Sequence, residues 1–124
     1  IGYWNDLVKK AQKAFAVKGP AFINVLSSCH RGWRFDQSKS VEIAKLAVDT
    51  CFWPLYEVED GEYRMTRKPK EKRPVREWLE CQGRFDHLFH PENEKALEAV
   101  QQEVDTRWNA LLRRCGESSE DGNA

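Results

Sequence analysis

The sequence predicts an α/β domain with a β-hairpin and a long C-terminal helix. Apolar residues recur at 3.6-residue spacing over residues 4–18 and again over 91–114, which indicates an amphipathic helix near each end of the chain. Between them, a short apolar run at 22–26 and the turn pair Asp60-Gly61 indicate strands. A chain of 124 residues is long enough for one domain with one core.

Composition and charge exclude several functional classes. Twenty basic and twenty acidic residues give a formal net charge of zero, so no overall attraction to nucleic acid or to an anionic membrane is expected. No apolar run reaches the length of about 20 residues that spans a bilayer. We expect a reducing, cytoplasmic setting, because the cysteines lie far apart without a C-x-x-C pair, at Cys29, Cys51, Cys81 and Cys115. The chain begins at Ile1 and runs directly into a helical pattern, so we expect it to belong to something longer.

The first third of the chain reads as a helix followed by a strand. Gly19 is expected to supply the C′ residue of the helix over 4–18, and Pro20 forbids its continuation. The strand over 22–26 is apolar on both sides except at Asn24, which is typical of a strand covered by helices on two faces. Tryptophans at helical spacing are interpreted as core residues, namely Trp4, Trp78 and Trp108.

The middle of the chain predicts a buried helix and a hairpin. Six apolar residues between 41 and 50 are too many for a narrow stripe, so this helix is expected to be well buried. Strands over 52–59 and 62–66 flank Asp60-Gly61, and both central residues of a type I′ turn favour positive φ.

The last half predicts a basic linker and two helices. The linker spans 67–76, and a short helix follows to about residue 82. A connector then carries three apolar anchors, Phe85, Leu88 and Phe89, into the helix over 91–114. The remaining tail lacks apolar anchors and is expected to be disordered. The apolar face of the long helix, which is expected to be buried, comprises Leu97, Val100, Val104, Trp108, Leu111 and Leu112.

Cys29 is the best candidate for chemistry, because it follows the apolar run at 22–26. The carboxyl end of a buried strand is where open α/β sheets present functional groups. Taken alone, such a thiol is more often an inert buried residue. A catalytic role is poorly supported, since His30 is only its sequence neighbour. A metal role needs partners, and an iron–sulfur cluster generally takes four thiolates that this chain is not expected to bring together alone.

Two further patterns have an ordinary and a functional interpretation. His87 and His90 are three residues apart, but without a convincing third ligand an ordinary connector is favoured over zinc. The basic run 67–76 is either a solvated linker or a docking strip for an acidic partner. No phosphate-binding glycine loop, nucleophile elbow or paired-carboxylate constellation is present in the sequence.

A series of short motifs indicates a more specific function than these single residues do. Their order along the chain is Ser28-Cys29-x-x-Gly32-Trp33, Val41-Glu-Ile-Ala-Lys-Leu-Ala-Val48, Phe52-Trp-Pro-Leu-Tyr-Glu57, Asp60-Gly-Glu-Tyr-Arg64, Lys72-Arg-Pro-Val75 and Gln82-Gly-Arg-Phe85. In order and spacing they resemble the C-terminal part of the beta subunit of pyruvate:ferredoxin oxidoreductases, within the 2-oxoacid:ferredoxin oxidoreductase family. The resemblance covers nearly everything from residue 1 to about residue 112.

The resemblance implies a fold and a division of the chain. It implies the C-terminal portion of a thiamine-diphosphate-binding, transketolase-like three-layer fold. Residues 1–66 would end that α/β domain and include the cluster-ligand loop and the hairpin. Residues 67–114 would form the basic linker and a C-terminal helical extension, and residues 115–124 a disordered tail.

The resemblance also implies a role for Cys29 as one of four ligands of a [4Fe–4S] cluster. The other three ligands, and the motif that binds thiamine diphosphate and Mg²⁺, would lie upstream of this chain. We therefore expect the chain alone to bind neither cofactor stably and to be inactive, and we assign it no catalytic residue. The family usually has proline directly after this cysteine, where this chain has His30.

The implied reaction is the oxidative decarboxylation of pyruvate with CoA to acetyl-CoA and CO₂, or the reverse synthesis. Electrons would pass through the cluster to ferredoxin, so the partners would be ferredoxin and the other subunits of the enzyme. Two alternatives stay open. One is a sister oxidoreductase acting on 2-ketoisovalerate or oxalate. The other is a free-standing, non-catalytic α/β module that binds a protein.

Overall fold

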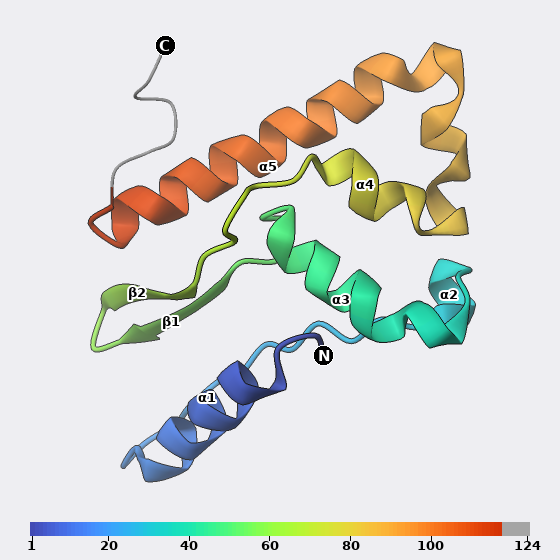
Figure 1. Ribbon diagram of the computed structural model, residues 1–124. Helices are drawn as coiled ribbons and strands as arrows, with labels where there is room; N and C mark the ends of the chain where they lie inside the picture. The colour runs from blue at the N-terminus through green and yellow to red at the C-terminus, as the bar shows by residue number, and fades with distance from the viewer. Residues whose placement is uncertain (118–124) are drawn as a thin grey trace.

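The computed structural model describes residues 1–117 as a mixture of helices and a two-stranded sheet. Figure 1 shows α4 between α3 and α5, with α1 on the far side of α3 and the hairpin beside the C-terminal end of α5. The helices and strands are α1 (Trp4–Ala16), α2 (His30–Trp33), α3 (Ser40–Asp49), β1 (Leu55–Glu59), β2 (Glu62–Arg67), α4 (Val75–Glu80) and α5 (Glu94–Arg114). Three 3-10 helices connect them, η1 (Gln37–Lys39), η2 (Gly83–Phe89) and η3 (Pro91–Asn93).

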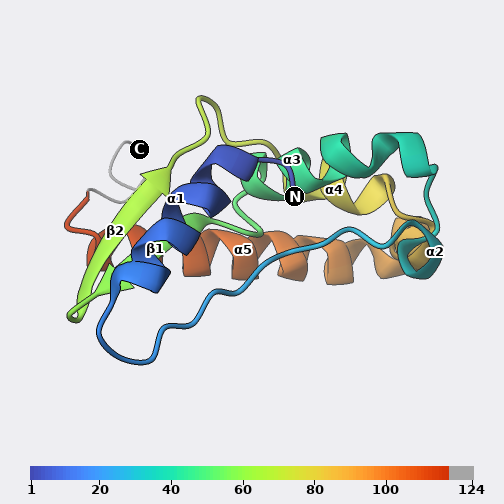
Figure 2. The same cartoon turned by 90° about the horizontal axis from the view of Figure 1, so that it is seen from below.

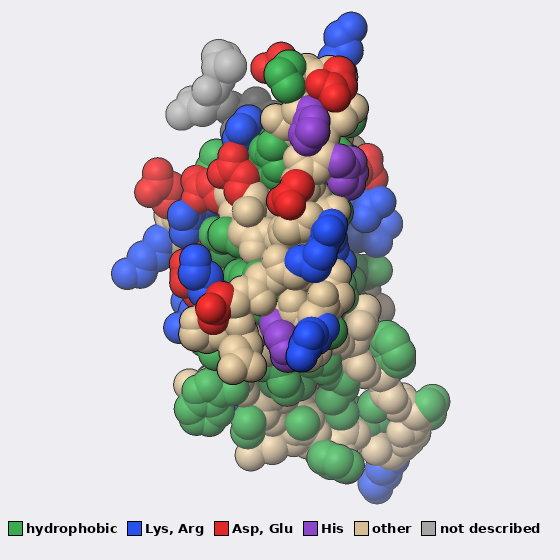
Figure 3. Space-filling view, turned by 90° about the vertical axis from the view of Figure 1, so that its right-hand side faces the viewer, with side chains coloured by type: hydrophobic (Ala, Val, Ile, Leu, Met, Phe, Trp, Pro, Cys, Tyr) green, Lys and Arg blue, Asp and Glu red, His purple; other side chains and the backbone are tan. Residues whose placement is uncertain are grey.

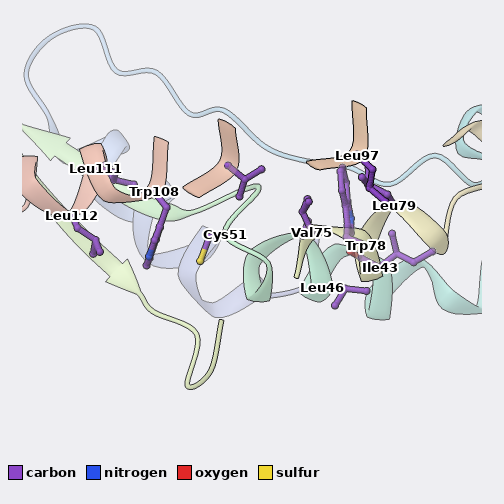
Figure 4. Packing of buried hydrophobic residues seen from close by; sticks show 12 residues of the cluster. Ile43, Leu46, Cys51, Val75, Trp78, Leu79, Leu97, Trp108, Leu111 and Leu112 are labelled. Atoms are coloured by element: carbon purple, nitrogen blue, oxygen red, sulfur yellow. Dashed lines mark hydrogen bonds between the residues drawn. The ribbon is translucent and has the colours of Figure 1, made fainter. Parts of the chain in front are cut away.

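The core lies between α3, α4 and α5 (Figure 4), and Trp78 is among its largest fully buried side chains. Trp78 is 1% exposed, and its indole Nε1 donates a hydrogen bond of 3.1 Å to the carbonyl of Ile43. The ring of Phe52 stacks on it at a centroid distance of 4.2 Å. The expected anchors of the connector pack against the same cluster, as predicted: Phe85, Leu88 and Phe89.

The long C-terminal helix is confirmed, and its expected apolar face is buried or half-buried. It begins at Glu94 because Pro91–Asn93 forms the 3-10 helix η3, and its 21 residues span about 31 Å. Its end is a Schellman motif: Gly116 has φ 72°, and the amide of Glu117 donates to the carbonyl of Leu112 at 3.0 Å. The expectation of a disordered tail from residue 115 is therefore wrong for residues 115–117, and residues 118–124 lie outside the described part.

The hairpin is confirmed with its turn. Asp60 and Gly61 have φ of 51° and 86°, as a type I′ turn requires, and Val58 pairs with Tyr63. β1 begins at Leu55, later than expected, because residues 50–53 turn back on α3. There the amide of Trp53 donates to the carbonyl of Ala47 at 2.9 Å.

Helix α4 starts without a local cap. Pro74 precedes it and offers no side-chain acceptor, so the first amide, that of Val75, donates to Oε1 of Gln101 on α5 at 2.8 Å. Gln101 is held in turn by Asp105, whose Oδ1 accepts from its Nε2 at 2.8 Å. A side chain of α5 therefore supplies what a sequence-local N-cap supplies in other helices.

Helix α1 forms as predicted but differs in its end and its burial. It ends at Ala16, and Val17 is extended, so Gly19 is not the C′ residue. None of the side chains of Trp4–Ala16 is buried, and Trp4 is 65% exposed, so the core assignment holds for Trp78 and Trp108 but is wrong for Trp4. Polar contacts attach α1 to its neighbours, including 3.0 Å from the Tyr3 hydroxyl to Asp49 Oδ1 on α3.

The expected strand over 22–26 is not formed. This segment runs extended across one face of the molecule (Figure 2), and no backbone hydrogen bond joins residues 20–26 to any other residue of the described range 1–117. A strand requires a neighbouring strand to pair with its amides and carbonyls, and Phe22 is 88% exposed.

In the part of the chain that the structure covers, no helix combines the length and the apolar composition of a membrane span.

Candidate functional site: the Cys29 loop

Cys29 ends the extended segment and caps the short helix α2. Its carbonyl accepts a hydrogen bond of 2.9 Å from the amide of Trp33, and its Sγ accepts one of 3.4 Å from the amide of Gly32. The thiol is exposed. The preference for an inert buried thiol, which the residue pattern alone favoured, is therefore wrong, and the sulfur is presented to the outside.

His30 occupies the first position of α2. This is the position at which proline is favoured in helices, because the first amide has no partner within the helix and φ near −65° suits it. His30 therefore stands where proline, the residue that the resemblance leads us to expect, would accept the same backbone conformation. We expect the turn around Cys29 to be kept despite this difference.

Two aromatic contacts dock the loop on the core. The ring of Trp33 meets that of Trp78 edge-on, with centroids 5.8 Å apart and planes at 85°. In addition, Cζ of Arg84 lies 4.2 Å from the centre of the Trp33 ring, in cation–π geometry. The Cys29 loop is thus attached to residues more than forty positions further along the chain.

The Arg84 side chain is itself fixed by a buried amide. Its Nε and Nη2 donate to Oε1 of Gln82 at 3.0 and 2.7 Å, and Nε2 of the fully buried Gln82 donates to the carbonyl of Trp78 at 2.7 Å. Burial lowers the pKa of the Arg84 guanidinium. Sequence reasoning missed these positioning residues, although they belong to the Gln82-Gly-Arg-Phe85 motif.

Gly83 allows the loop and η2 to approach closely. Its amide donates to the carbonyl of Arg34 at 3.1 Å. A Cβ at this position would lie 3.1 Å from that same carbonyl oxygen and 3.2 Å from the Cβ of Arg34. Arg34 itself is in the left-handed region, with φ 57°, where it ends α2.

The other cysteines lie in different surroundings. Cys51 is buried in the core, whereas Cys81 and Cys115 are half-buried. Burial, followed by the carboxylate of Glu42, raises the pKa of the Cys81 thiol. Among residues 1–117, no group of three or more His, Cys, Asp or Glu side chains is arranged to hold a metal ion. A metal centre that included the exposed Cys29 sulfur would thus need ligands from outside residues 1–117.

The two histidines are placed apart from Cys29 in the chain. His87 lies within η2 and His90 directly after it, where its Nδ1 is 3.6 Å from a carboxylate oxygen of Glu92. The carbonyl of His87 accepts a hydrogen bond of 2.7 Å from Nδ2 of Asn93. These contacts stabilise the turn between η2 and α5.

Most charges of the basic run 67–76 have partners within the chain. Lys72 pairs with Asp105 at 3.0 Å, and Cζ of Arg67 lies 3.8 Å from the centre of the Tyr3 ring. Three further pairs are Lys68 with Glu117, Arg73 with Glu77, and Arg76 with Glu80. Four of the six basic side chains of the run thus have an acidic partner within residues 1–117, whereas Arg67 lies over a neutral ring.

Comparison with known proteins identifies relatives of the chain, while no family model matches it. A pyruvate synthase subunit PorB of Thermotoga maritima is 49% identical over 108 residues, which are 86% of this chain and 33% of that protein. The pyruvate synthase subunit PorB of Methanosarcina barkeri is 47% identical over 88% of this chain and 36% of its own length. The ketoisovalerate oxidoreductase subunit VorB of Pyrococcus furiosus is 39% identical over 91% and 36%.

These similarities place the chain in the family of 2-oxoacid oxidoreductase subunits. Within that family, its sequence corresponds to the C-terminal part of pyruvate synthase subunit PorB, and the resemblance noted in the motifs is confirmed. The chain spans about a third of the length of the curated relatives that it matches.

Proposed function

We propose that this chain forms the C-terminal part of the beta subunit of a pyruvate:ferredoxin oxidoreductase. The full enzyme would convert pyruvate and CoA to acetyl-CoA and CO₂ with electrons passed to ferredoxin, or run the reverse synthesis. The observation that carries this proposal is the identity of 49% and 47% to two pyruvate synthase subunits PorB, over 86% and 88% of the chain.

The proposal gives Cys29 the role of one thiolate ligand of a [4Fe–4S] cluster. Its exposed sulfur with an amide N–H directed at it suits this role, because such hydrogen bonds stabilise thiolate charge at a cluster. When bound, the cluster supplies one-electron transfer between the thiamine diphosphate site and ferredoxin. Thiamine diphosphate with Mg²⁺ would be held by the upstream part of the subunit.

The remaining residues of the site hold the Cys29 sulfur in position. Gly32 donates its amide to the thiolate, Trp33 seats the loop on the core, and Arg84 covers Trp33 from outside. None of them would touch pyruvate or CoA; we propose no catalytic residue in this chain and expect it to be inactive alone.

The division of the chain that we propose also follows from its resemblance to the beta subunit. Residues 1–66 would complete the thiamine-diphosphate-binding α/β domain, and 67–114 would be the linker and helical extension. Residues 115–117 belong to the capped end of α5, so we assign them to the proposed helical extension. We further propose a cytoplasmic enzyme with other subunits and ferredoxin as partners.

The basic run 67–76 is the proposed contact for one of these partners. Within residues 1–117 no ion pair is found for Lys70, so it is the member most available to an acidic surface. Charge reversal at Lys70, Lys72 and Arg73 is expected to slow ferredoxin reduction or assembly at low salt. Unchanged turnover and assembly would show that the run is a linker only.

The cluster assignment is tested in the full-length subunit with Cys29→Ser. We expect the [4Fe–4S] signal in electron paramagnetic resonance to be lost or strongly altered, while Cys115→Ser, at the end of α5, leaves it intact. An undiminished signal in Cys29→Ser would refute the ligand role. Comparing kcat/KM for pyruvate, 2-ketoisovalerate and oxalate decides between the sister enzymes. A reading frame that starts near Ile1 would instead favour a free-standing protein-binding module.

A further inference from the structure

Helix α1 and the segment that follows it expose a concentration of large apolar side chains. Phe15 is 92% exposed and Phe22 88%, values at which neither ring contributes to a core. Figure 3 shows apolar side chains gathered over the lower part of the molecule, whereas charged side chains dominate the upper part. We call this set the α1 face; its members are Trp4, Val8, Phe15, Val17, Phe22, Ile23 and Val25.

The segment and α1 lie side by side against α3. Together they line a cavity of about 60 Å³ whose walls include Leu7 of α1, Leu26 of the segment and Val48 of α3. Leu26 is half-buried and joins the core cluster, so the segment is anchored at its C-terminal end. Its outer side is open over residues 22–25.

The backbone of the segment is also without partners. Between residues 20 and 26 no backbone amide or carbonyl is hydrogen-bonded to any residue of the described range 1–117. Extended backbone with apolar side chains to both sides is the form of an interior strand, which pairs along both edges and is covered on both faces. As an exposed edge, the same segment would be an aggregation hazard.

We propose that the α1 face and residues 22–26 form the docking surface for the amino-terminal part of the same subunit. This rests on the proposed function, because the relatives extend over about three times the length that the chain matches. The occupant would contribute at least one strand that pairs with residues 22–26, and an apolar layer that covers Phe15 and Phe22. Docking there holds the segment that ends at Cys29, so it would bring Cys29 up to the upstream ligands.

The first test is hydrogen–deuterium exchange of the unsubstituted protein, in the 124-residue chain and in the full-length subunit. Amides of residues 22–26 are expected to exchange at nearly unprotected rates in the short chain and at least about 100-fold more slowly in the full subunit. Amides of α5 serve as the internal reference, because they are hydrogen-bonded in both. Unprotected amides at 22–26 in a full subunit with protected α5 would overturn the proposal.

A second test uses a substitution whose effect should depend on the upstream part. Phe22→Asp is expected to leave the thermal midpoint of the 124-residue chain within about 1 °C, because the ring is exposed there. In the full subunit it should lower the midpoint by about 5 °C or more, since a charge would then be placed in an apolar interface. Val58→Asp, at a position 49% exposed on the hairpin, is the matched control and should have a small effect in both.

These outcomes separate the two proposals. If the enzyme assembled with this full subunit oxidises pyruvate, but residues 22–26 of the subunit stay unprotected or Phe22→Asp and Val58→Asp have equal effects, the docking surface is refuted and the enzyme assignment stands. If the segment is protected but the assembled enzyme does not oxidise pyruvate, the enzyme assignment is refuted and the docking surface is supported.

Discussion

Replacing Gly83 by alanine should loosen the Cys29 loop. The added Cβ would stand 3.1 Å from the carbonyl oxygen of Arg34, closer than nearly all such contacts, so either α2 or η2 must shift. The shift strains the hydrogen bond from the Gly83 amide to the same oxygen, now 3.1 Å, and a hydrogen bond of this kind contributes about 0.5–1.5 kcal/mol. Overpacking adds a cost of about 1–3 kcal/mol, and a lower unfolded-state entropy returns about 0.4–1 kcal/mol.

The net expectation for Gly83→Ala is a loss of about 0.5–4 kcal/mol in the free energy of unfolding. Gly19→Ala is the matched control, because a Cβ there meets nothing within 4 Å. It should leave stability unchanged or raise it by up to about 1 kcal/mol. Urea unfolding under reducing conditions, followed by circular dichroism, compares the two. If Gly83→Ala were as stable as Gly19→Ala, the close approach of η2 to α2 would not exist in solution.

Three further outcomes are expected. Trp78→Ala should lower the free energy of unfolding by about 3–5 kcal/mol, whereas Trp4→Ala should change it by less than about 0.5 kcal/mol, as measured by urea unfolding. Arg34→Gly should raise it by about 1 kcal/mol, since φ 57° is strained for a side-chain-bearing residue; a loss would contradict this backbone conformation. Burial and then Asp49 raise the pKa of Tyr3 from its ordinary value of 10.0. The resulting stabilisation is full below pH 10.0 and is lost as pH rises through the raised pKa, so Tyr3→Phe should flatten the fall in stability above about pH 10; an identical pH profile would refute it.

The elements that the sequence predicted well are those specified by neighbouring residues. The hairpin follows from Asp60-Gly61, whose positive φ values are a local requirement. The long helix follows from a repeating apolar face and needs no knowledge of its partners beyond their being apolar. The end of α5 carried an equally local signal in Gly116, which the reading of the tail as polar and unanchored overlooked.

The elements that were mispredicted depend on distant residues. An apolar extended run becomes a strand only where another strand lies beside it, so the pattern at 22–26 described a strand's composition and not its pairing. The candidate site shows the same division. Cys29 could be singled out from sequence, but Gln82, Gly83 and Arg84 meet its loop only through tertiary contacts that no periodicity encodes.

The cap that α5 provides for α4 has a consequence for the order of folding. The six residues of α4 are too few to be helical by themselves, and their first amide finds its acceptor 26 positions along the chain. Helix α4 therefore gains part of its stability from α5, beside the hydrogen bond that Trp78 makes to Ile43 of α3, and that part should be lost when α5 departs. The two helices would thus open and close as one cooperative unit, and the slowest-exchanging amides of α4 would report on the docking of α5.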